Sequence, residues 1–113
     1  MDAILRRIHE IEEKPHPKFP GVFVRQMAVT KETERLSAGI VRIIPGAELF
    51  PHTHEVLEVF HILEGHGMAL VNGERIEVRG GEVVIAPIGN EHGLINIGER
   101  DIVLYAVFSP GIA

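Results

Sequence analysis

The stretch Met68-Ala-Leu-Val-Asn72-Gly73-Glu-Arg-Ile-Glu-Val78 places an Asn-Gly pair between two short runs that contain apolar residues. Both central residues of a tight hairpin turn need a positive φ angle, which Asn and Gly adopt more readily than other residues. The stretch therefore predicts a β-hairpin with strands Met68–Val71 and Arg75–Val78.

Similar short runs of branched and aromatic residues occur on both sides of this hairpin, and Gly, Pro or charged residues separate them. They predict six further strands: Val22–Val29, Leu36–Ile44, Val56–Leu63, Val83–Ala86, Leu94–Ile97 and Ile102–Phe108. Many short strands punctuated in this way are typical of a β-sandwich or a small barrel. The sequence therefore predicts an all-β fold.

The N-terminal part has a different pattern. Ile4, Ile8 and Ile11 are spaced i, i+4 and i+7, and Pro15 follows, so residues 3–14 are predicted to form a short amphipathic helix. The chain has 113 residues, which suits a single domain. We expect residues 1–21 to be a helix with a linker and residues 22–113 to be the β-barrel domain.

The composition excludes several classes of function. The chain has no cysteine, which rules out disulfides, thiolate metal sites and a cysteine nucleophile. Its 16 acidic and 11 basic side chains give a net charge of −5, a poor match to nucleic acid or anionic lipid. The first residues lack the apolar run of a signal peptide, and no stretch approaches the length of a membrane span. We expect a cytoplasmic protein without nucleic-acid or membrane partners.

The last predicted strand, Ile102–Phe108, is apolar at both alternating sets of positions. One face would fill the barrel, and the other would need a cover. The N-terminal helix could cover part of it and a second copy of the chain the rest, so we expect a homodimer.

Three of the seven histidines and one carboxylate form a candidate metal site. His52 and His54 would lie on one face of a strand, and Glu58 has the same parity. His92 follows a turn that could aim it into the same interior. Imidazole and carboxylate together suit Fe, Mn, Ni, Cu or Zn. The alternative is a pair of histidines on a solvated strand. Structural roles are expected for the remaining four histidines: His9, His16, His61 and His66.

The spacing of these residues resembles the two motifs of the cupin family. Gly46, His52, His54, Glu58 and Gly65 fill every fixed position of the first motif, and Gly81, Pro87, Gly89, His92 and Asn96 fill the second. The resemblance implies a single-domain cupin, a double-stranded β-helix of jelly-roll type that is usually dimeric. It also implies that His52, His54, Glu58 and His92 bind one divalent transition metal. Gly46, Gly65 and Gly81 are expected at turns with positive φ.

Residues that share the parity of the candidate ligands indicate what surrounds them. Phe60, Ile62 and Leu94 predict an apolar cavity, with Phe50 at its mouth. Asn96 either hydrogen-bonds near the site or staples the backbone. Only Arg25 and Arg42 could hold a phosphate, which disfavours a phosphosugar substrate.

The resemblance and the apolar lining point to a mononuclear metalloenzyme of the oxygenase, decarboxylase or isomerase type, which would act on a small carbonyl or enol compound. A non-catalytic small-molecule-binding or sensor protein is the alternative. No catalytic acid or base can be assigned, because Glu48 and Glu91 also fit solvated positions.

Overall fold

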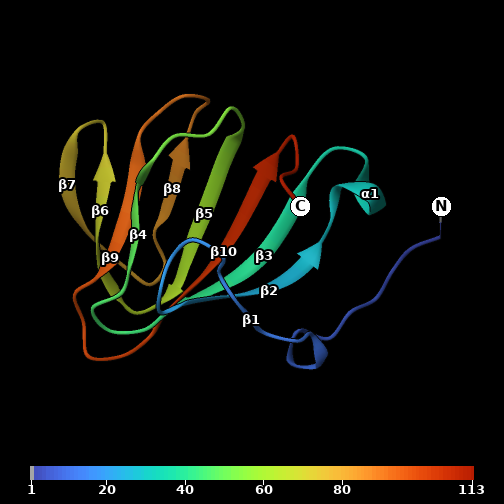
Figure 1. Ribbon diagram of the computed structural model, residues 1–113, viewed down its shortest axis with the longest axis horizontal. Helices are drawn as coiled ribbons and strands as arrows, with labels where there is room; N and C mark the ends of the chain where they lie inside the picture. Colours follow the sequence, from blue (N-terminus) through green and yellow to red (C-terminus); the bar gives the residue numbers. More distant parts are fainter. Residues whose placement is uncertain (1) are drawn as a thin grey trace.

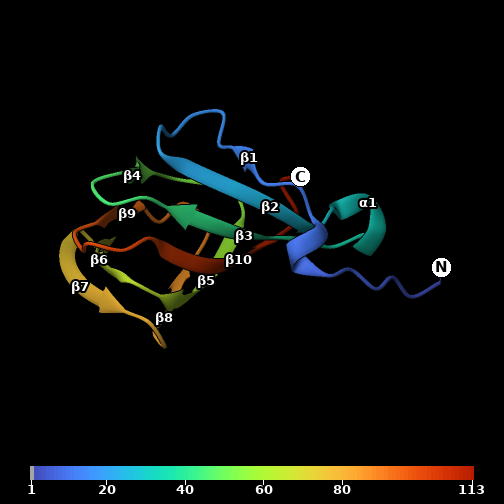
Figure 2. The same ribbon diagram turned by 90° about the horizontal axis from the view of Figure 1, so that it is seen from below.

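The computed structural model describes residues 2–113, which form two antiparallel sheets that face each other (Figures 1 and 2). The six-stranded sheet has the order β1 (Lys14–Pro15), β2 (Val22–Ala28), β3 (Ser37–Ile43), β10 (Ile102–Ser109), β5 (Leu57–Glu64) and β8 (Val83–Ala86). The four-stranded sheet has the order β4 (Glu48–His52), β9 (His92–Asn96), β6 (His66–Val71) and β7 (Glu74–Arg79). The predicted all-β jelly-roll barrel is confirmed. Among residues 2–113, no helix is long and apolar enough to span a membrane.

All eight strands expected from the sequence are present, with ends that differ by at most two residues. The hairpin of β6 and β7 turns at Asn72 and Gly73, whose φ angles are 52° and 76°. Two strands were not predicted. β4 contains Pro51, which lowers its strand signal, but β4 lies at the edge of its sheet, where a missing N–H donor is tolerated. β1 is only two residues long. A short helix, α1 (Thr30–Thr33), lies in the predicted charged loop between β2 and β3.

The core lies between the sheets because alternate side chains of each strand point inward. In β5, Glu58, Phe60 and Ile62 are buried, whereas the intervening residues are partly exposed. Leu104 of β10 and Leu94 of β9 join the same apolar cluster from the two sheets. Glu58 is therefore a charged residue in a row of core positions.

The predicted helix over residues 3–14 is wrong. This segment contains only η1 (Ile8–Glu10), a single 3₁₀ turn with no buried residue. Isolated helices shorter than about 12 residues are marginal without a packed apolar face. Here the guanidinium of Arg25 donates to the carbonyl oxygens of Ile8 and Ile11, so side-chain donors take the place of a continued helical ladder.

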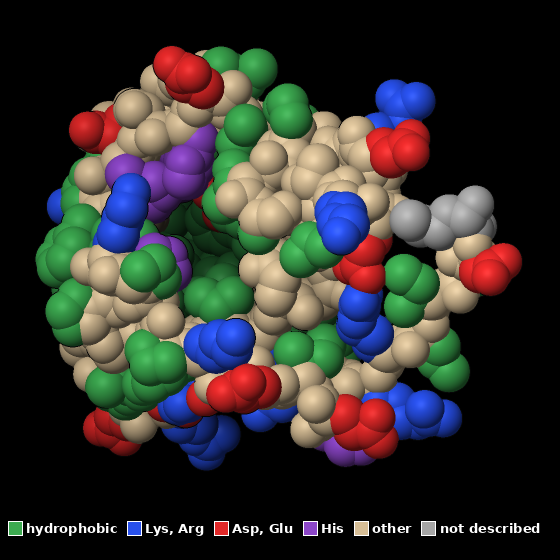
Figure 3. All heavy atoms as spheres, turned by 45° about the vertical axis from the view of Figure 1, so that its right-hand side comes forward, with side chains coloured by type: hydrophobic (Ala, Val, Ile, Leu, Met, Phe, Trp, Pro, Cys, Tyr) green, Lys and Arg blue, Asp and Glu red, His purple; other side chains and the backbone are tan. Residues whose placement is uncertain are grey.

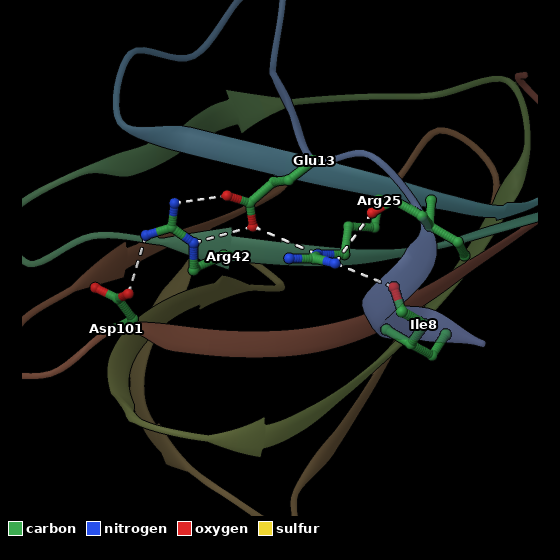
Figure 4. Close-up of polar contacts among 6 residues, drawn as sticks. Ile8, Glu13, Arg25, Arg42 and Asp101 are labelled. Carbon is green, nitrogen blue, oxygen red and sulfur yellow. Dashed lines mark hydrogen bonds and ion pairs between the residues drawn. The ribbon is translucent and has the colours of Figure 1, made fainter.

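Ion pairs hold the N-terminal segment against the outer face of β2 and β3 (Figure 4). Arg42 donates two hydrogen bonds to Glu13, at 2.7 and 3.0 Å, and one to Asp101 at 3.0 Å. It also lies 4.5 Å above the ring of Phe23. Arg42 and Arg25 therefore point away from the barrel interior, and neither could bind a phosphate inside it.

Candidate metal centre

The four candidate ligands meet where the two sheets approach each other. His52 is the last residue of β4 and pairs with His92, the first residue of β9. Glu58 comes from β5 of the opposite sheet, and His54 lies in the connection between β4 and β5. One nitrogen or oxygen atom from each of the four lies within 4.8 Å of the others.

The route by which these residues converge differs from the one inferred by parity. β4 ends at His52, so the first three candidates do not share one strand face. His52 comes from the end of β4, His54 from the loop after it and Glu58 from β5. They meet because the chain passes from one sheet to the other between β4 and β5. His92 joins the group by the route that the sequence predicted: it follows a turn and lies at the start of β9.

Hydrogen bonds orient two of the imidazoles. His52 Nδ1 lies 2.6 Å from the carbonyl oxygen of Phe50, and His92 Nδ1 lies 2.9 Å from that of Asn90. A backbone carbonyl can only accept, so Nδ1 carries the proton in both rings. This arrangement directs each Nε2 toward the cluster, in the way that outer hydrogen bonds orient metal-binding histidines.

Glu58 links the histidines from its buried position. Its Oε1 atom is 2.7 Å from His92 Nε2 and 3.4 Å from His54 Nε2. Burial lowers the pKa of His92, but the hydrogen bonds to Glu58 and Asn90 outweigh this effect and raise the pKa above its usual value. Burial and the neighbouring His52 together lower the pKa of His54 despite the attraction of Glu58. The single carboxylate thus stabilises positive charge at the centre of the cluster.

This donor set fits a divalent first-row transition metal. Three imidazoles and one carboxylate provide borderline nitrogen donors and one hard oxygen donor, and they converge at a partly buried position. The cluster could hold a metal ion through His52, His54, Glu58 and His92, the same four residues that the motifs single out.

The residues that the sequence predicted to line a cavity do not share one environment. Phe60, Ile62 and Leu94 are fully buried core residues. Phe50 is 49% exposed, and its ring lies 5.8 Å from that of Phe19. Asn96 is buried and bonds only to backbone: its amide donates to the carbonyls of Ile43 and Arg100, and its oxygen accepts from Gly98 N. Asn96 thus links the end of β3 to the loop after β9 through hydrogen bonds.

A cavity of about 550 Å³ lies on the inner face of the six-stranded sheet; none of the four candidate ligands lines it, but one of its lining residues, Phe108, contacts the cluster. The inner faces of β2, β3 and β10 form its floor, and the segment 11–17 forms one of its walls. Figure 3 shows a hollow with hydrophobic side chains at its base and histidines along one side. Phe108 connects the two places, because it lines the cavity, pairs with Glu58 across the sheet and packs edge-on against His54.

His16 belongs to this cavity, although the sequence suggested only a linker residue. Its ring lies 4.6 Å from that of Phe19, which in turn lies 5.6 Å from His52. Burial lowers the pKa of His16, as do the nearby Lys18 and His52, so its neutral form is favoured. No spacing rule points to His16, because the contact depends on how the N-terminal segment crosses the barrel.

The other three histidines lie away from the cluster. His9 is exposed in η1, and His61 is on the outer face of β5, as its parity predicted. His66 begins β6, and its Nε2 contacts Glu77 of β7 at 2.5 Å.

The cupin-domain family model matches residues 39–108, more than half of the chain, so the protein belongs to the cupin family. A crystal structure of a predicted oxalate decarboxylase from Thermotoga maritima superposes with a TM-score of 0.88, covering 95% of this chain and 99% of that one at 22% identity. This likeness supports the fold alone.

Curated relatives are similar over shorter stretches. An oxalate-binding protein from Thermotoga maritima is 31% identical over 68 residues, which cover 59% of this chain and 56% of that protein. A 1-hydroxy-2-naphthoate 1,2-dioxygenase from Nocardioides is 31% identical over 86 residues, 74% of this chain but 21% of the enzyme. The chain therefore matches about half of the first relative and about a fifth of the second.

Proposed function

We propose that this protein is a mononuclear metal-dependent enzyme of the oxygenase, decarboxylase or isomerase type, acting on a small carbonyl or enol compound. His52, His54, Glu58 and His92 would bind one divalent ion of Fe, Mn, Ni, Cu or Zn. The observation that supports the proposal most directly is the convergence of these four ligand groups within 4.8 Å, beside a cavity large enough for a small molecule.

Four protein ligands leave room for substrate on an ion that accepts five or six, which distinguishes a catalytic site from a closed structural one. Such a bound ion supplies Lewis-acid activation of an oxygen atom of the substrate. The chain contributes orientation, because the carbonyls of Phe50 and Asn90 fix two imidazoles. It also contributes exclusion of water, since the rings of Phe19 and Phe108 pack against His52 and His54.

The side chains around the site give no clear acid or base. Glu91 is exposed and Glu48 is half-buried in β4. Among the described residues that line the cavity, the charged ones are Glu12 and Lys14, and both are exposed. None of the described residues that line the cavity is an arginine, which further disfavours a phosphorylated substrate.

The relatives support two candidate functions. The names of the dioxygenase relatives favour ring-oxidising chemistry. The name of the oxalate-binding protein favours the alternative, a protein that binds a small molecule without converting it. We rank the enzyme first because all four candidate ligands are present and converge.

Elemental analysis of protein purified without chelator tests the proposal. We expect about one transition-metal ion per chain, and its loss from His52→Ala and His92→Ala. His61→Ala is the matched control, because His61 lies on the outer face of β5 and should leave metal content unchanged. Full occupancy in both cluster variants would refute the ligand assignment.

Substrate panels then separate the enzyme from the binding protein. Oxygen uptake and product analysis with diketones, enols and hydroxylated aromatic acids should reveal turnover that the His92→Ala variant lacks. Tight ligand binding with metal present and no turnover would favour the alternative.

We also propose that the protein is a homodimer. The outer face of the six-stranded sheet carries exposed apolar side chains on β5, β8 and β10, with Leu63, Val83 and Ile85 each at least 46% exposed and Tyr105 at 37%. The N-terminal segment lies against the outer face of β2 and β3 only, so we expect a second copy of the chain to cover the exposed apolar side chains of β5, β8 and β10.

A further inference from the structure

The cavity beside the metal cluster is apolar over most of its surface. Val24, Val41, Ala106 and Phe108 face it from the strands, and Ile11 faces it from the N-terminal segment. A ligand with many hydroxyl groups would leave them without partners on such walls, at a cost in binding free energy for each. The walls therefore favour a ligand with an apolar body.

Two polar side chains of the cavity are already engaged in holding the fold. Gln26 Nε2 donates to the carbonyl oxygens of Ala28 and Ala38, at 3.1 and 3.0 Å. Ser37 Oγ accepts a hydrogen bond from Ile112 N at 2.9 Å. The donors of Gln26 are thus used up, and Ser37 is completely buried.

His16 is different because one of its nitrogen atoms remains available. Its Nδ1 accepts a hydrogen bond from the backbone N–H of Lys18 at 3.0 Å, so the ring proton resides on Nε2. None of the side-chain hydrogen bonds found within residues 2–113 involves this Nε2. Phe19 packs against the ring, and this contact limits the directions in which the imidazole can turn.

We propose that His16 selects the ligand of this cavity by donating an Nε2–H hydrogen bond to an oxygen atom on a flat, ring-bearing carboxylate or ketone. The apolar ring would lie against Phe108 on the floor formed by β2, β3 and β10. This proposal rests on the proposed function in one respect: the reactive end of the ligand would point toward the metal cluster.

The shape of the site supports a ring rather than a small dianion. At about 550 Å³ the cavity far exceeds what a two-carbon dicarboxylate would fill. The one cation among its lining residues is Lys14, an exposed residue of the two-residue strand β1. A dianion would gain little charge stabilisation there, whereas an aromatic body would bury apolar surface against Phe108 and stack favourably.

Fluorescence titration with 2-naphthoate tests this inference on the protein as purified. The chain has no tryptophan and one tyrosine, so the probe can be excited without protein background. We expect saturable binding that His16→Ala weakens about fivefold to tenfold, the usual effect of losing one hydrogen bond. His16→Gln, whose amide can place a donor near the same point, should bind within about twofold of the unmodified protein. His9→Ala is the matched control on an exposed histidine.

A second variant tests the cavity independently of His16. Val41→Phe adds bulk on the cavity floor and should weaken 2-naphthoate binding by more than tenfold, whereas oxalate should not compete with the probe. Unchanged affinity in His16→Ala, no recovery in His16→Gln, or no saturable binding by the unmodified protein would each overturn the inference.

Metal analysis of the same samples keeps this inference separate from the proposed function. Metal retained without naphthoate binding would refute the role of His16 and leave the metalloenzyme proposal standing. Naphthoate binding that depends on His16, in a protein that holds no metal, would support the inference and refute the proposed metal centre.

Discussion

Replacing Asn96 by Ala should destabilise the protein severely while leaving the candidate metal site of His52, His54, Glu58 and His92 intact. Asn96 is 2% exposed, and it makes three hydrogen bonds to backbone groups, each between 2.8 and 2.9 Å. These bonds join the end of β3 to the loop between β9 and β10. In the family motif Asn96 accompanies the metal ligands, but in this structure it bonds to none of them.

The expected loss of unfolding free energy in Asn96→Ala follows from the number of backbone groups that lose their hydrogen-bond partner. Each lost hydrogen bond to a buried group costs about 1 kcal/mol, and unpaired carbonyls that stay buried add to this. Three bonds therefore give a loss of about 3 kcal/mol, a large part of the 5–15 kcal/mol typical of a domain. For a chain of this size, the melting temperature would fall by roughly 10–15 °C.

Urea unfolding followed by circular dichroism measures this loss, and elemental analysis measures metal content. Unfolding should be done with chelator present, because metal bound to the native state would raise its apparent stability. Asn90→Ala is the matched control: its amide contacts only the exposed Asn72, so it should cost less than about 0.5 kcal/mol. A loss below about 1 kcal/mol in Asn96→Ala, or metal loss without destabilisation, would refute the reasoning.

Two further predictions concern the outside of the barrel. Arg42 lowers the pKa of Glu13 through their hydrogen bonds, so the stabilisation they provide is present above the usual pKa of a glutamate, about 4.3, and is lost as the pH falls through the lowered value. Glu13→Gln should therefore lower the unfolding free energy at pH 7 by up to about 1 kcal/mol, with the difference vanishing once the pH falls below the lowered pKa of Glu13, and a difference independent of pH would contradict this account. Light scattering at micromolar concentration should show a dimer that Ile85→Asp dissociates and Ile76→Asp, on β7 of the other sheet, does not; a monomeric parent protein would exclude the proposed interface.

The strands could be predicted because their signals are local. Asn72 and Gly73 adopt the positive φ angles that the turn requires, and the branched runs around them become strands. Gly65 was likewise expected at a turn: its φ is 102°, and a Cβ atom there would lie 2.7 Å from the Cα of Ile102. The positive φ angle and the lack of space for a Cβ atom therefore both favour glycine at position 65.

The N-terminal segment could not be predicted in the same way. The spacing of Ile4, Ile8 and Ile11 matches a helix, but helix formation needs a surface on which that face can pack. The ion pairs and hydrogen bonds of Arg25 and Arg42 instead hold the segment extended along β2 and β3. Both arginines are distant in sequence from the residues they hold, so no local pattern could reveal the contact.

The sequence by itself determined the β architecture and the identity of the four candidate ligands, because turn residues and motif spacing are properties of neighbouring positions. Only the tertiary structure decided how those ligands meet, from both sheets and a loop, and that Asn96 bonds to backbone. It also decided that His16 faces the cavity. The physical reason is that cavities and long-range hydrogen bonds arise between segments far apart in the chain, whose relative positions are fixed by packing rather than by local preference.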